Sequence, residues 1–574
     1  HWVTGLVALL LVLLVACGAA AKPADAPKAK EPAPAKGVAA QPAPPPTAAP
    51  KPAAPPAAVK SAKTRAIVVT EAEPAAVGAW ALGCSAEIHS MGCGEFTTDY
   101  LTWLDDKANF EVVPLSGIQS WEAVAGDPKR WRFKLRQGVK FHNGEPWNAE
   151  AAKLGIDWNG VGTNPGTGFS YTGPTKGEVV DEYTVDVVCG RPCPIFPRTA
   201  VFTKFQAPKW WASASEEEKT AMTMGFGPYR ITGYRRGVDT SFEIYDGYLP
   251  NKTHFSQPAT IKQITHVYRA EGVVRAAMAT AGEADWSADV AFEDCDKVPQ
   301  CKLSTTTEVY TLVLDTMWHP ELKKQKVRLA LAHAIDCQGL LDSLFKGKVK
   351  CHAAIAPRAT VGITAENSKP RAYDPDLAKR LLKEAGYDPK NEVNVNTRPG
   401  SNIRGLEIME AVVSYWRAVG VTSKLNSWGD LAKARDLQLS GCGQFGKDAV
   451  FKEKLDCAQR SPPGPYFATS HAYEVATSDE ILDMQRQGGA RMNCFGRSSR
   501  VCYTELQKKI DIASGTPAGP ERTRLMEEIG DIAYQEVYFI PIFEVLMAYA
   551  MSKDVAWEPY YAPRLRGNTM KWAK

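Results

Sequence analysis

Alternating apolar and polar residues predict a strand followed by a helix in the first third of the chain. In residues 131–136 (WRFKLR), apolar side chains alternate with basic ones, which is the period of a strand with one buried face. Gln137-Gly138 and Asn143-Gly144 are turn dipeptides. A short helix is expected to begin near Asn148, with Glu150 in its first turn.

A second region has the strand and helix periods of an α/β lobe. Asp374 is a predicted N-cap, Pro375 suits the first helical position, and Gly386 ends the helix. A second predicted helix ends at Gly420 and is followed by a predicted strand. The apolar face of the first helix contains Leu377, Leu381, Leu382 and Ala385, that of the second contains Ile408, Val412, Trp416 and Val419, and the strand contains Val421, Ser423 and Leu425.

The N-terminal segment is predicted to target the chain to a membrane. Residues 6–16 are apolar, too few for a transmembrane helix but typical of a signal-peptide core. No charged segment precedes them, so we expect the natural chain to start before His1. The sequence around Cys17 resembles a bacterial lipobox, in which the cysteine carries the lipid. The alternative is an ordinary signal peptide with an incidental cysteine.

Residues 18–64 are rich in alanine and proline, and such a composition predicts a disordered linker. The rest of the chain is long enough for two or three lobes. The formal net charge is only +4, and no basic stripe with interleaved aromatic residues occurs, so a nucleic-acid partner is not expected.

The cysteines other than Cys17 number twelve and occur as near neighbours in the sequence. Short disulfide loops of this kind fit an oxidising, extracytoplasmic compartment. A metal site is the alternative, but neither a CxxC motif nor a zinc-type Cys/His spacing occurs. The candidate pairs are Cys84 and Cys93, Cys189 and Cys193, Cys295 and Cys301, Cys337 and Cys351, Cys442 and Cys457, and Cys494 and Cys502.

Several segments between about Tyr100 and Asp430, and one near the C-terminus, together resemble the extracellular solute-binding proteins of family 5. This family contains the dipeptide-, oligopeptide- and nickel-binding proteins of ABC importers. The matching segments are Trp121-Glu122, residues 131–146 (WRFKLRQGVKFHNGEP), Ala149-Glu150, and residues 180–185 (VDEYTV), 225–229 (GFGPY), 281–285 (AGEAD), 326–336 (KVRLALAHAID) and 540–543 (IPIF).

The resemblance implies an α/β, two-lobed periplasmic-binding-protein fold of type II, cluster C-like, with an extra subdomain in the first lobe. The expected parts are a signal peptide and lipobox (1–17), the linker (18–64), a first lobe (65–311) with a subdomain near 100–180, a second lobe (312–538), and a C-terminal segment that returns to the first lobe (539–574). Residues 310–315 and 538–541 are the predicted hinge segments, and they could equally be buried strands.

The implied function is capture of a small ligand, a peptide above all, between hinged lobes and delivery to an ABC permease. The protein is expected to be a lipid-anchored monomer on the extracytoplasmic face of the membrane, or in the periplasm, without catalytic activity or a cofactor. A sugar or a metal chelate is an alternative ligand. A non-transport lipoprotein, either receptor or enzyme, is an alternative role.

The candidate ligand-binding residues are those that suit a polar organic solute, namely aromatic walls and a few charges. For each of them a core or surface position is an equal alternative. The family's amino-terminus-binding aspartate cannot be placed on Asp448, because the surrounding residues lack the family's tryptophan-rich pattern. Residues 168–172 (GFSYT) and 441–446 (GCGQFG) are incomplete or isolated motif matches and predict no catalytic or nucleotide site. The candidates are Trp286, Trp318, Arg404, Trp428 and Asp430.

Overall fold

The computed structural model describes residues 63–70, 96–160, 174–200, 203–397, 404–427, 472–478, 491–492, 500–560 and 565–573. The chain divides into residues 1–61 and one compact unit formed by residues 62–574, which contains all the elements below. Among the described residues, the apolar helices are all too short to cross a bilayer.

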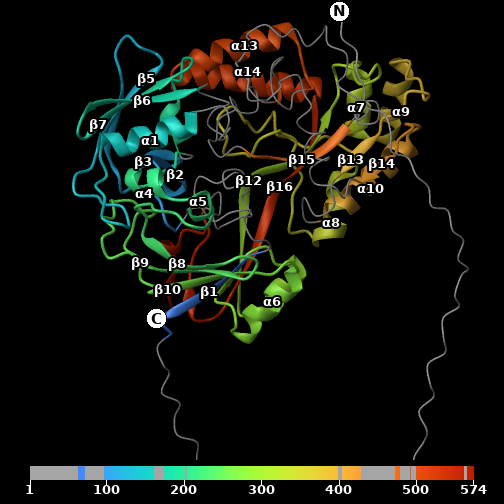
Figure 1. Ribbon diagram of the computed structural model, residues 1–574. Helices are drawn as coiled ribbons and strands as arrows, with labels where there is room; N and C mark the ends of the chain where they lie inside the picture. Colours follow the sequence, from blue (N-terminus) through green and yellow to red (C-terminus); the bar gives the residue numbers. More distant parts are fainter. Residues whose placement is uncertain are drawn as a thin grey trace, which may run out of the picture. The chain divides into compact units, whose positions relative to one another are not determined.

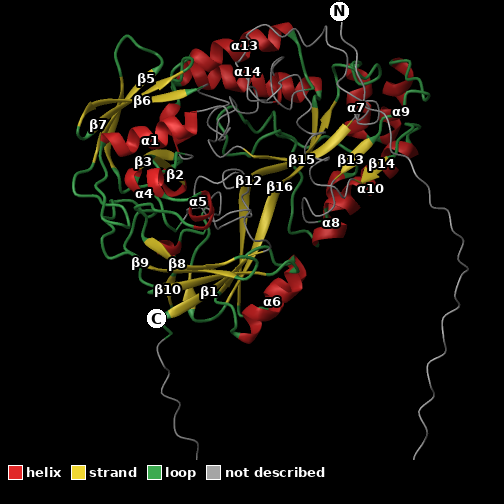
Figure 2. Ribbon diagram, viewed as in Figure 1, coloured by secondary structure: helices red, strands yellow, loops and turns green. Residues whose placement is uncertain are grey.

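The strands and helices follow one another as Figures 1 and 2 show. The strands are β1 (Arg65–Thr70), β2 (Thr102–Asp105), β3 (Glu111–Pro114), β4 (Ile118–Ala123), β5 (Arg130–Leu135), β6 (Thr175–Asp181), β7 (Thr184–Cys189), β8 (Tyr229–Arg235), β9 (Asp239–Ile244), β10 (Gln263–Tyr268), β11 (Trp286–Ser287), β12 (Gln300–Leu314), β13 (Val395–Thr397), β14 (Leu425–Ser427), β15 (Ala472–Ser478), β16 (Phe539–Met551), β17 (Val555–Ala556) and β18 (Lys571–Trp572).

The helices are α1 (Ala149–Gly160), α3 (Phe196–Thr199), α4 (Pro208–Ser213), α5 (Glu216–Ala221), α6 (Gly272–Ala281), α7 (Gln325–His333), α8 (Cys337–Phe345), α9 (Pro375–Glu384), α10 (Gly405–Ala418), α13 (Thr504–Gly515) and α14 (Pro520–Glu536), with the 3-10 turns η1 (Asp106–Ala108), η3 (Phe292–Lys297) and η6 (Gly567–Thr569).

One ten-stranded sheet runs through both lobes in the order β14-β13-β15-β12-β16-β11-β1-β10-β9-β8. The long antiparallel strands β12 and β16 belong to both halves of this sheet (Figure 1). The second half of β12 pairs with β15, and the last residues of β16 pair with β11. The sheet continues from β15 into one lobe and from β11 into the other. The two-lobed α/β fold predicted from the sequence is therefore confirmed.

The first lobe contains β1 and β8–β11 and a buried ion pair. Asp99 and Arg566, which are 467 positions apart in the sequence, form a salt bridge with both side chains fully buried. The second carboxylate oxygen of Asp99 accepts hydrogen bonds from the Ser116 N–H (3.1 Å) and the Tyr248 hydroxyl (3.1 Å). Since Arg566 lies near the C-terminus, the last segment of the chain is part of this lobe's core.

A separate four-stranded antiparallel sheet, β4-β5-β7-β6, packs against α1 and has its own core. Strand β5 is the predicted amphipathic segment, shifted by one residue. Its outward-facing Arg130 and Arg132 bind Asp186 on β7, at 3.2 Å and 2.8 Å. The Asn148 side chain accepts a hydrogen bond from the Ala151 N–H (3.1 Å), which confirms the predicted start of α1.

Helices cover both faces of the second-lobe sheet. Leu312 and Leu314 of β12 share a core with α7, α8 and α10, whereas Val313 packs on the opposite face against α13 and α14. This alternation is the period of a strand buried on both sides. The Asp374 carboxylate accepts a hydrogen bond from the Leu377 N–H (2.8 Å), so the predicted N-cap of α9 is confirmed.

Candidate functional site

The second lobe directs the carboxyl ends of three strands toward the first lobe. β13 is parallel to both β14 and β15. β15 is antiparallel to β12, with Ala472 opposite Leu314 and Ser478 opposite Glu308. Because β12 runs from the first lobe into the second, β15 and its parallel neighbours run back toward the first lobe.

The first lobe directs the carboxyl ends of three of its own strands toward the second lobe. β1 is parallel to both β10 and β11, and β11 is antiparallel to β16, with Ser287 opposite Ala550. Since β16 runs into the first lobe, these three strands run toward the second. Open α/β sheets bind ligands beyond the carboxyl ends of their strands. We call the carboxyl ends of β1, β10, β11, β13, β14 and β15 the interlobe region; it is the candidate ligand site.

A bulge in β12 lies where the crossing strands pass the interlobe region. Thr305 is opposite Leu546 and Val309 is opposite Glu544, so residues 306–308 together face the single residue Val545. All three bulge residues are buried. A bulge bends the strand that carries it and increases its twist. A smaller irregularity falls between Tyr310 and Thr311, within the predicted hinge segment 310–315, whereas residues 311–314 are regular buried strand and Asp315 follows the strand.

Arg275 of α6 holds the first-lobe loops at the interlobe region. Its buried guanidinium donates hydrogen bonds to the carbonyl oxygens of Arg269 (2.6 Å) and Ala270 (2.7 Å) after β10. It also donates to the carbonyls of Ala288 (2.9 Å) and Asp289 after β11. One side chain therefore positions the two loops that leave parallel strands at this edge.

Arg404 immediately precedes α10, which follows the carboxyl end of β13. It adopts a left-handed backbone conformation (φ 56°) and forms a salt bridge with Glu293 of η3. The Glu293 carboxylate accepts a hydrogen bond from the Glu293 backbone N–H, and this bond, together with the Arg404 guanidinium, lowers the pKa of the Glu293 carboxyl. The Arg404–Glu293 pair therefore joins α10 to η3, the turn between β11 and the crossover strand β12.

Glu544 lies on β16 beside the bulge and binds a second-lobe loop. Its carboxylate accepts hydrogen bonds from the Arg358 N–H (2.6 Å) and guanidinium (2.7 Å). The neighbouring His352 is buried, and its Nε2 faces the Ala356 carbonyl at 2.8 Å. Burial lowers the pKa of His352, so this imidazole is neutral at pH 7.

The structure separates the sequence-predicted ligand residues. Trp286 is fully buried in the first-lobe core, with its ring 5.2 Å from Tyr549 and 5.4 Å from Trp557. Trp318 follows the second-lobe end of β12, and its backbone N–H donates to the Asp315 carboxylate (3.0 Å). Among the three candidates within the described residues, Arg404 alone lies at the interlobe region.

The remaining candidates, Trp428 and Asp430, lie outside the described residues. In the sequence they directly follow β14, which ends at Ser427. Asp448 and Cys17 also lie outside the described residues.

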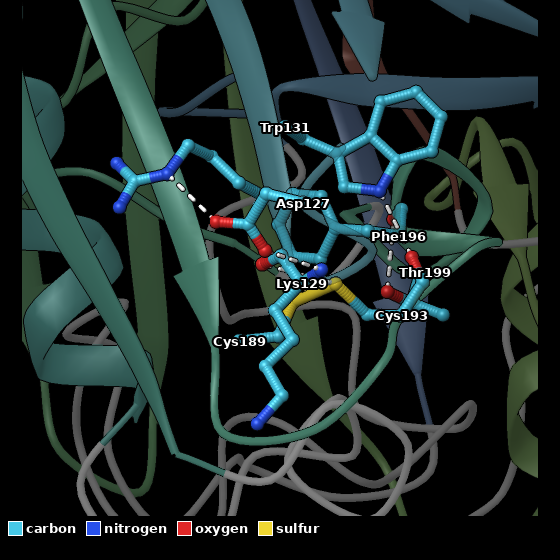
Figure 3. The surroundings of a disulfide bond; sticks show 8 residues. Asp127, Lys129, Trp131, Cys189, Cys193, Phe196 and Thr199 are labelled. Carbon is cyan, nitrogen blue, oxygen red and sulfur yellow. Dashed lines mark hydrogen bonds and ion pairs between the residues drawn. A yellow bond between two sulfur atoms is a disulfide. The ribbon is translucent and has the colours of Figure 1, made fainter. Parts of the chain in front are cut away.

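Three of the candidate cysteine pairs lie at bonding distance. The sulfur–sulfur distances are 2.26 Å for Cys189–Cys193, 2.09 Å for Cys295–Cys301 and 2.07 Å for Cys337–Cys351. Figure 3 shows the first pair, where the Trp131 indole N–H donates to the Cys193 carbonyl (2.9 Å). Cys502 is also disulfide-bonded. The other candidate cysteines, Cys84, Cys93, Cys442, Cys457 and Cys494, lie outside the described residues.

Sequence reasoning did not single out Arg275, Glu293, Arg358 or Glu544. A single charged residue has no period, so hydrophobic patterning cannot find it. The available signal for Arg275 was its position shortly after a strand, since ligand sites lie beyond the carboxyl ends of parallel strands.

Comparison with known proteins agrees with this topology. The glutathione-binding protein GsiB of Salmonella typhimurium is 24% identical over 457 residues, covering 75% of this chain and 81% of GsiB. The structure of NikA from Brucella suis in complex with Fe(III)-EDTA superposes with a TM-score of 0.71 and 21% identity, covering 89% of this chain and all of NikA (100%). Helicobacter pylori DppA in complex with the peptide STSA gives a TM-score of 0.69 and 16% identity, covering 89% of this chain and 98% of DppA.

The family model for bacterial extracellular solute-binding proteins, family 5, matches residues 116–461, which is more than half of the chain. Proteins of this family bind transported solutes on the outside of the cytoplasmic compartment, and they are not enzymes, as the sequence resemblance predicted. This chain therefore belongs to the bacterial extracellular solute-binding proteins of family 5.

Proposed function

We propose that this protein is the lipid-anchored binding component of an ABC importer and that it captures a peptide or peptide-like solute in the interlobe region. The observation that carries the proposal is the convergence of six parallel-strand ends, three from each lobe, on one region beside the β12 bulge. A ligand held from both sides stabilises the closed arrangement by its higher affinity for that state.

Peptide-like ligands are favoured by the relatives, since one is named for glutathione binding and another holds a bound peptide. The ion pair between Arg404 and Glu293 supports this site, because it joins α10, which follows β13, to η3, which follows β11. In this proposal, the permease takes up the solute from the closed protein, and Cys17 carries the acyl chains that keep the protein at the membrane.

The first test is native mass spectrometry of the full chain purified without denaturation. The expected result is a peptide, or a mixture of peptides, that stays bound in the native protein and is released by unfolding. A protein that carries no solute, and whose melting temperature responds to no peptide in a library, would contradict the proposal.

The lipid anchor is tested separately by growing an expressing bacterium with a labelled fatty acid. Wild-type protein should carry the label, and the Cys17→Ser variant should lose it and leave the membrane fraction. A label retained by Cys17→Ser would refute acylation at this residue without affecting the transport proposal.

A metal chelate is the second candidate ligand, since NikA holds Fe(III)-EDTA. The same mass spectrum distinguishes the two classes. A bound metal with its chelator would show an isotope pattern and a mass that no peptide reproduces.

A further inference from the structure

Two neighbouring acids and a distant histidine meet at the edge of the first lobe. Asp105 ends β2, and Asp106 begins the 3-10 turn η1 that connects β2 to β3. His254 comes from the segment between β9 and β10, about 150 positions later in the sequence. The proposed solute site does not use these residues.

The three side chains lie at the spacing of ligands around one metal ion. The Nδ1 of His254 is 3.3 Å from an oxygen of Asp105, and its Nε2 is 3.5 Å from an oxygen of Asp106. One ligand atom from each residue can be chosen so that all lie within 4.8 Å of one another. Two ligands of a tetrahedral zinc ion with bonds of about 2.0–2.2 Å are about 3.3–3.6 Å apart, and either His254–carboxylate distance fits this range when its own ring nitrogen is the ligand.

The chemistry of these groups also suits a transition metal. Imidazole nitrogen together with carboxylate oxygens is a common ligand set for Zn²⁺, whereas Ca²⁺ and Mg²⁺ prefer oxygen ligands alone. Three protein ligands would leave a fourth position for water. A single ion binds only one of the two ring nitrogens, so either Nδ1 or Nε2 of His254 would be the ligand and the other nitrogen would remain unbound to the metal.

Packing holds the three groups in place before any ion arrives. Asp105 caps η1 by accepting a hydrogen bond from the Lys107 N–H (3.0 Å). The His254 ring lies against the Phe255 ring (3.6 Å between centroids), and Phe255 is fully buried in the first-lobe core. The side chains of Asp105, Asp106 and His254 are 14%, 17% and 21% exposed, whereas the Asp106 Oδ1 and His254 Nε2 atoms are buried, so the candidate ligand atoms are shielded from bulk solvent.

We propose that Asp105, Asp106 and His254 form a divalent transition-metal site, with Zn²⁺ as the expected ion. The bound ion would tie the β2–β3 hairpin to the segment that leads into β10. It would therefore stabilise the first lobe independently of the transported solute, and this proposal can fail while the proposed transport function stands.

The experiment uses the full chain without a histidine tag, stripped with EDTA and titrated with Zn²⁺ by calorimetry. One ion should bind per chain and raise the melting temperature, and Co²⁺ should give the visible absorption of a tetrahedral site. Asp106→Asn and His254→Gln should each weaken Zn²⁺ binding by at least about tenfold. Asp376→Asn, which alters an 83%-exposed acid on α9, is the matched control and should bind as the wild type does.

Circular dichroism verifies that each variant is folded, and Asp105→Asn provides a second carboxylate test. If wild-type protein binds no Zn²⁺, or if all variants bind it equally, the metal site is refuted. In the first case, the three side chains contact one another without an ion, and His254→Gln should then change stability equally with and without EDTA.

Discussion

Arg404, at the start of α10, forms a salt bridge with Glu293 of η3 and so connects the segments that follow β13 and β11, two strands whose carboxyl ends lie at the interlobe region. Both side chains are about one-third exposed. The pair is therefore accessible to solvent and salt, and it can break without leaving a buried charge.

Replacing Glu293 with glutamine should weaken solute binding only a few-fold. An ion pair at this exposure contributes at most about 1 kcal/mol, which corresponds to about fivefold in Kd. The co-purified solute provides the calorimetric probe, and Arg524→Ala, in a surface cluster on α14, is the control. If Arg404→Ala raises the Kd for the solute more than a hundredfold while Glu293→Gln raises it little, Arg404 contacts the solute itself.

Removal of one member of the Asp99–Arg566 pair should be severe. Arg566→Met leaves the Asp99 carboxylate buried without its counter-charge, so we expect a loss of about 3–5 kcal/mol in the free energy of unfolding. Urea denaturation measures it. The double variant with Asp99→Asn should recover part of the loss, and an additive double variant would show that the two charges are not coupled.

Gly227, in the GFGPY segment, should not tolerate a side chain. A Cβ at this position would lie 2.5 Å from the Thr97 carbonyl carbon and 2.5 Å from the Thr98 amide nitrogen, and neither backbone atom can move aside. Gly227→Ala should cost at least about 2 kcal/mol of unfolding free energy. The control is Gly233→Ala on β8, whose new Cβ would meet only Ser241, at 3.8 Å; it should change stability by less than about 1 kcal/mol.

Cys337→Ser should destabilise more than Cys189→Ser. The Cys337–Cys351 bond closes a loop across 14 positions, whereas Cys189–Cys193 closes one across 4. Loop-closure entropy gives about 3 kcal/mol for the longer loop and about 2 kcal/mol for the shorter one. Denaturation of both variants, with peptide mapping of the wild-type pairs, measures this. Equal losses would argue against an entropic origin.

Acid should destabilise the protein through its buried histidines. Burial lowers the pKa of His266 to about 3 and that of His142 to about 4. The unfolded chain, with a histidine pKa near 6.5, therefore binds more protons between these values. The stability contributed by the neutral histidines is fully present above pH 6.5 and is lost as the pH falls toward 4.

His266→Gln should reduce the slope of unfolding free energy against pH by about 1 kcal/mol per unit between pH 6 and 5. His333→Gln, at a position that is not deeply buried, is the control. An unchanged slope in His266→Gln would mean that this histidine is protonated in the folded protein.

The sequence was most informative where burial is periodic. The N-cap at Asp374, the apolar face of α10 and the one-sided strand β5 all followed from local patterns. The predicted strand at residues 421–425 overlaps β14 (Leu425–Ser427) only at its end, although the Thr422 and Lys424 carbonyls already accept hydrogen bonds from the Val393 and Val395 N–H groups, both at 2.8 Å. Alternating burial reports which side chains face the core and not the bounds of a strand.

The ligand residues were harder to predict, because they depend on contacts between distant segments. Trp286 resembled a pocket residue by composition, yet β11 lies in the interior of the sheet and buries the ring. Arg404 and Glu293 are 111 positions apart, and no local pattern relates them. The cluster of Asp105, Asp106 and His254 was missed for the same reason, because His254 is distant in sequence from the two acids.

Strand β16 also constrains how this chain can mature. Translation and export both deliver the N-terminus first, yet the neighbour of β11 in the first-lobe sheet is supplied by the final tenth of the sequence. The Asp99 carboxylate likewise gains its ion-pair partner only when Arg566 has been made. The lobe whose first strand is made first therefore depends on residues made much later, so a chain interrupted before β16 lacks the strand that lies between β12 and β11 and cannot complete the ten-stranded sheet.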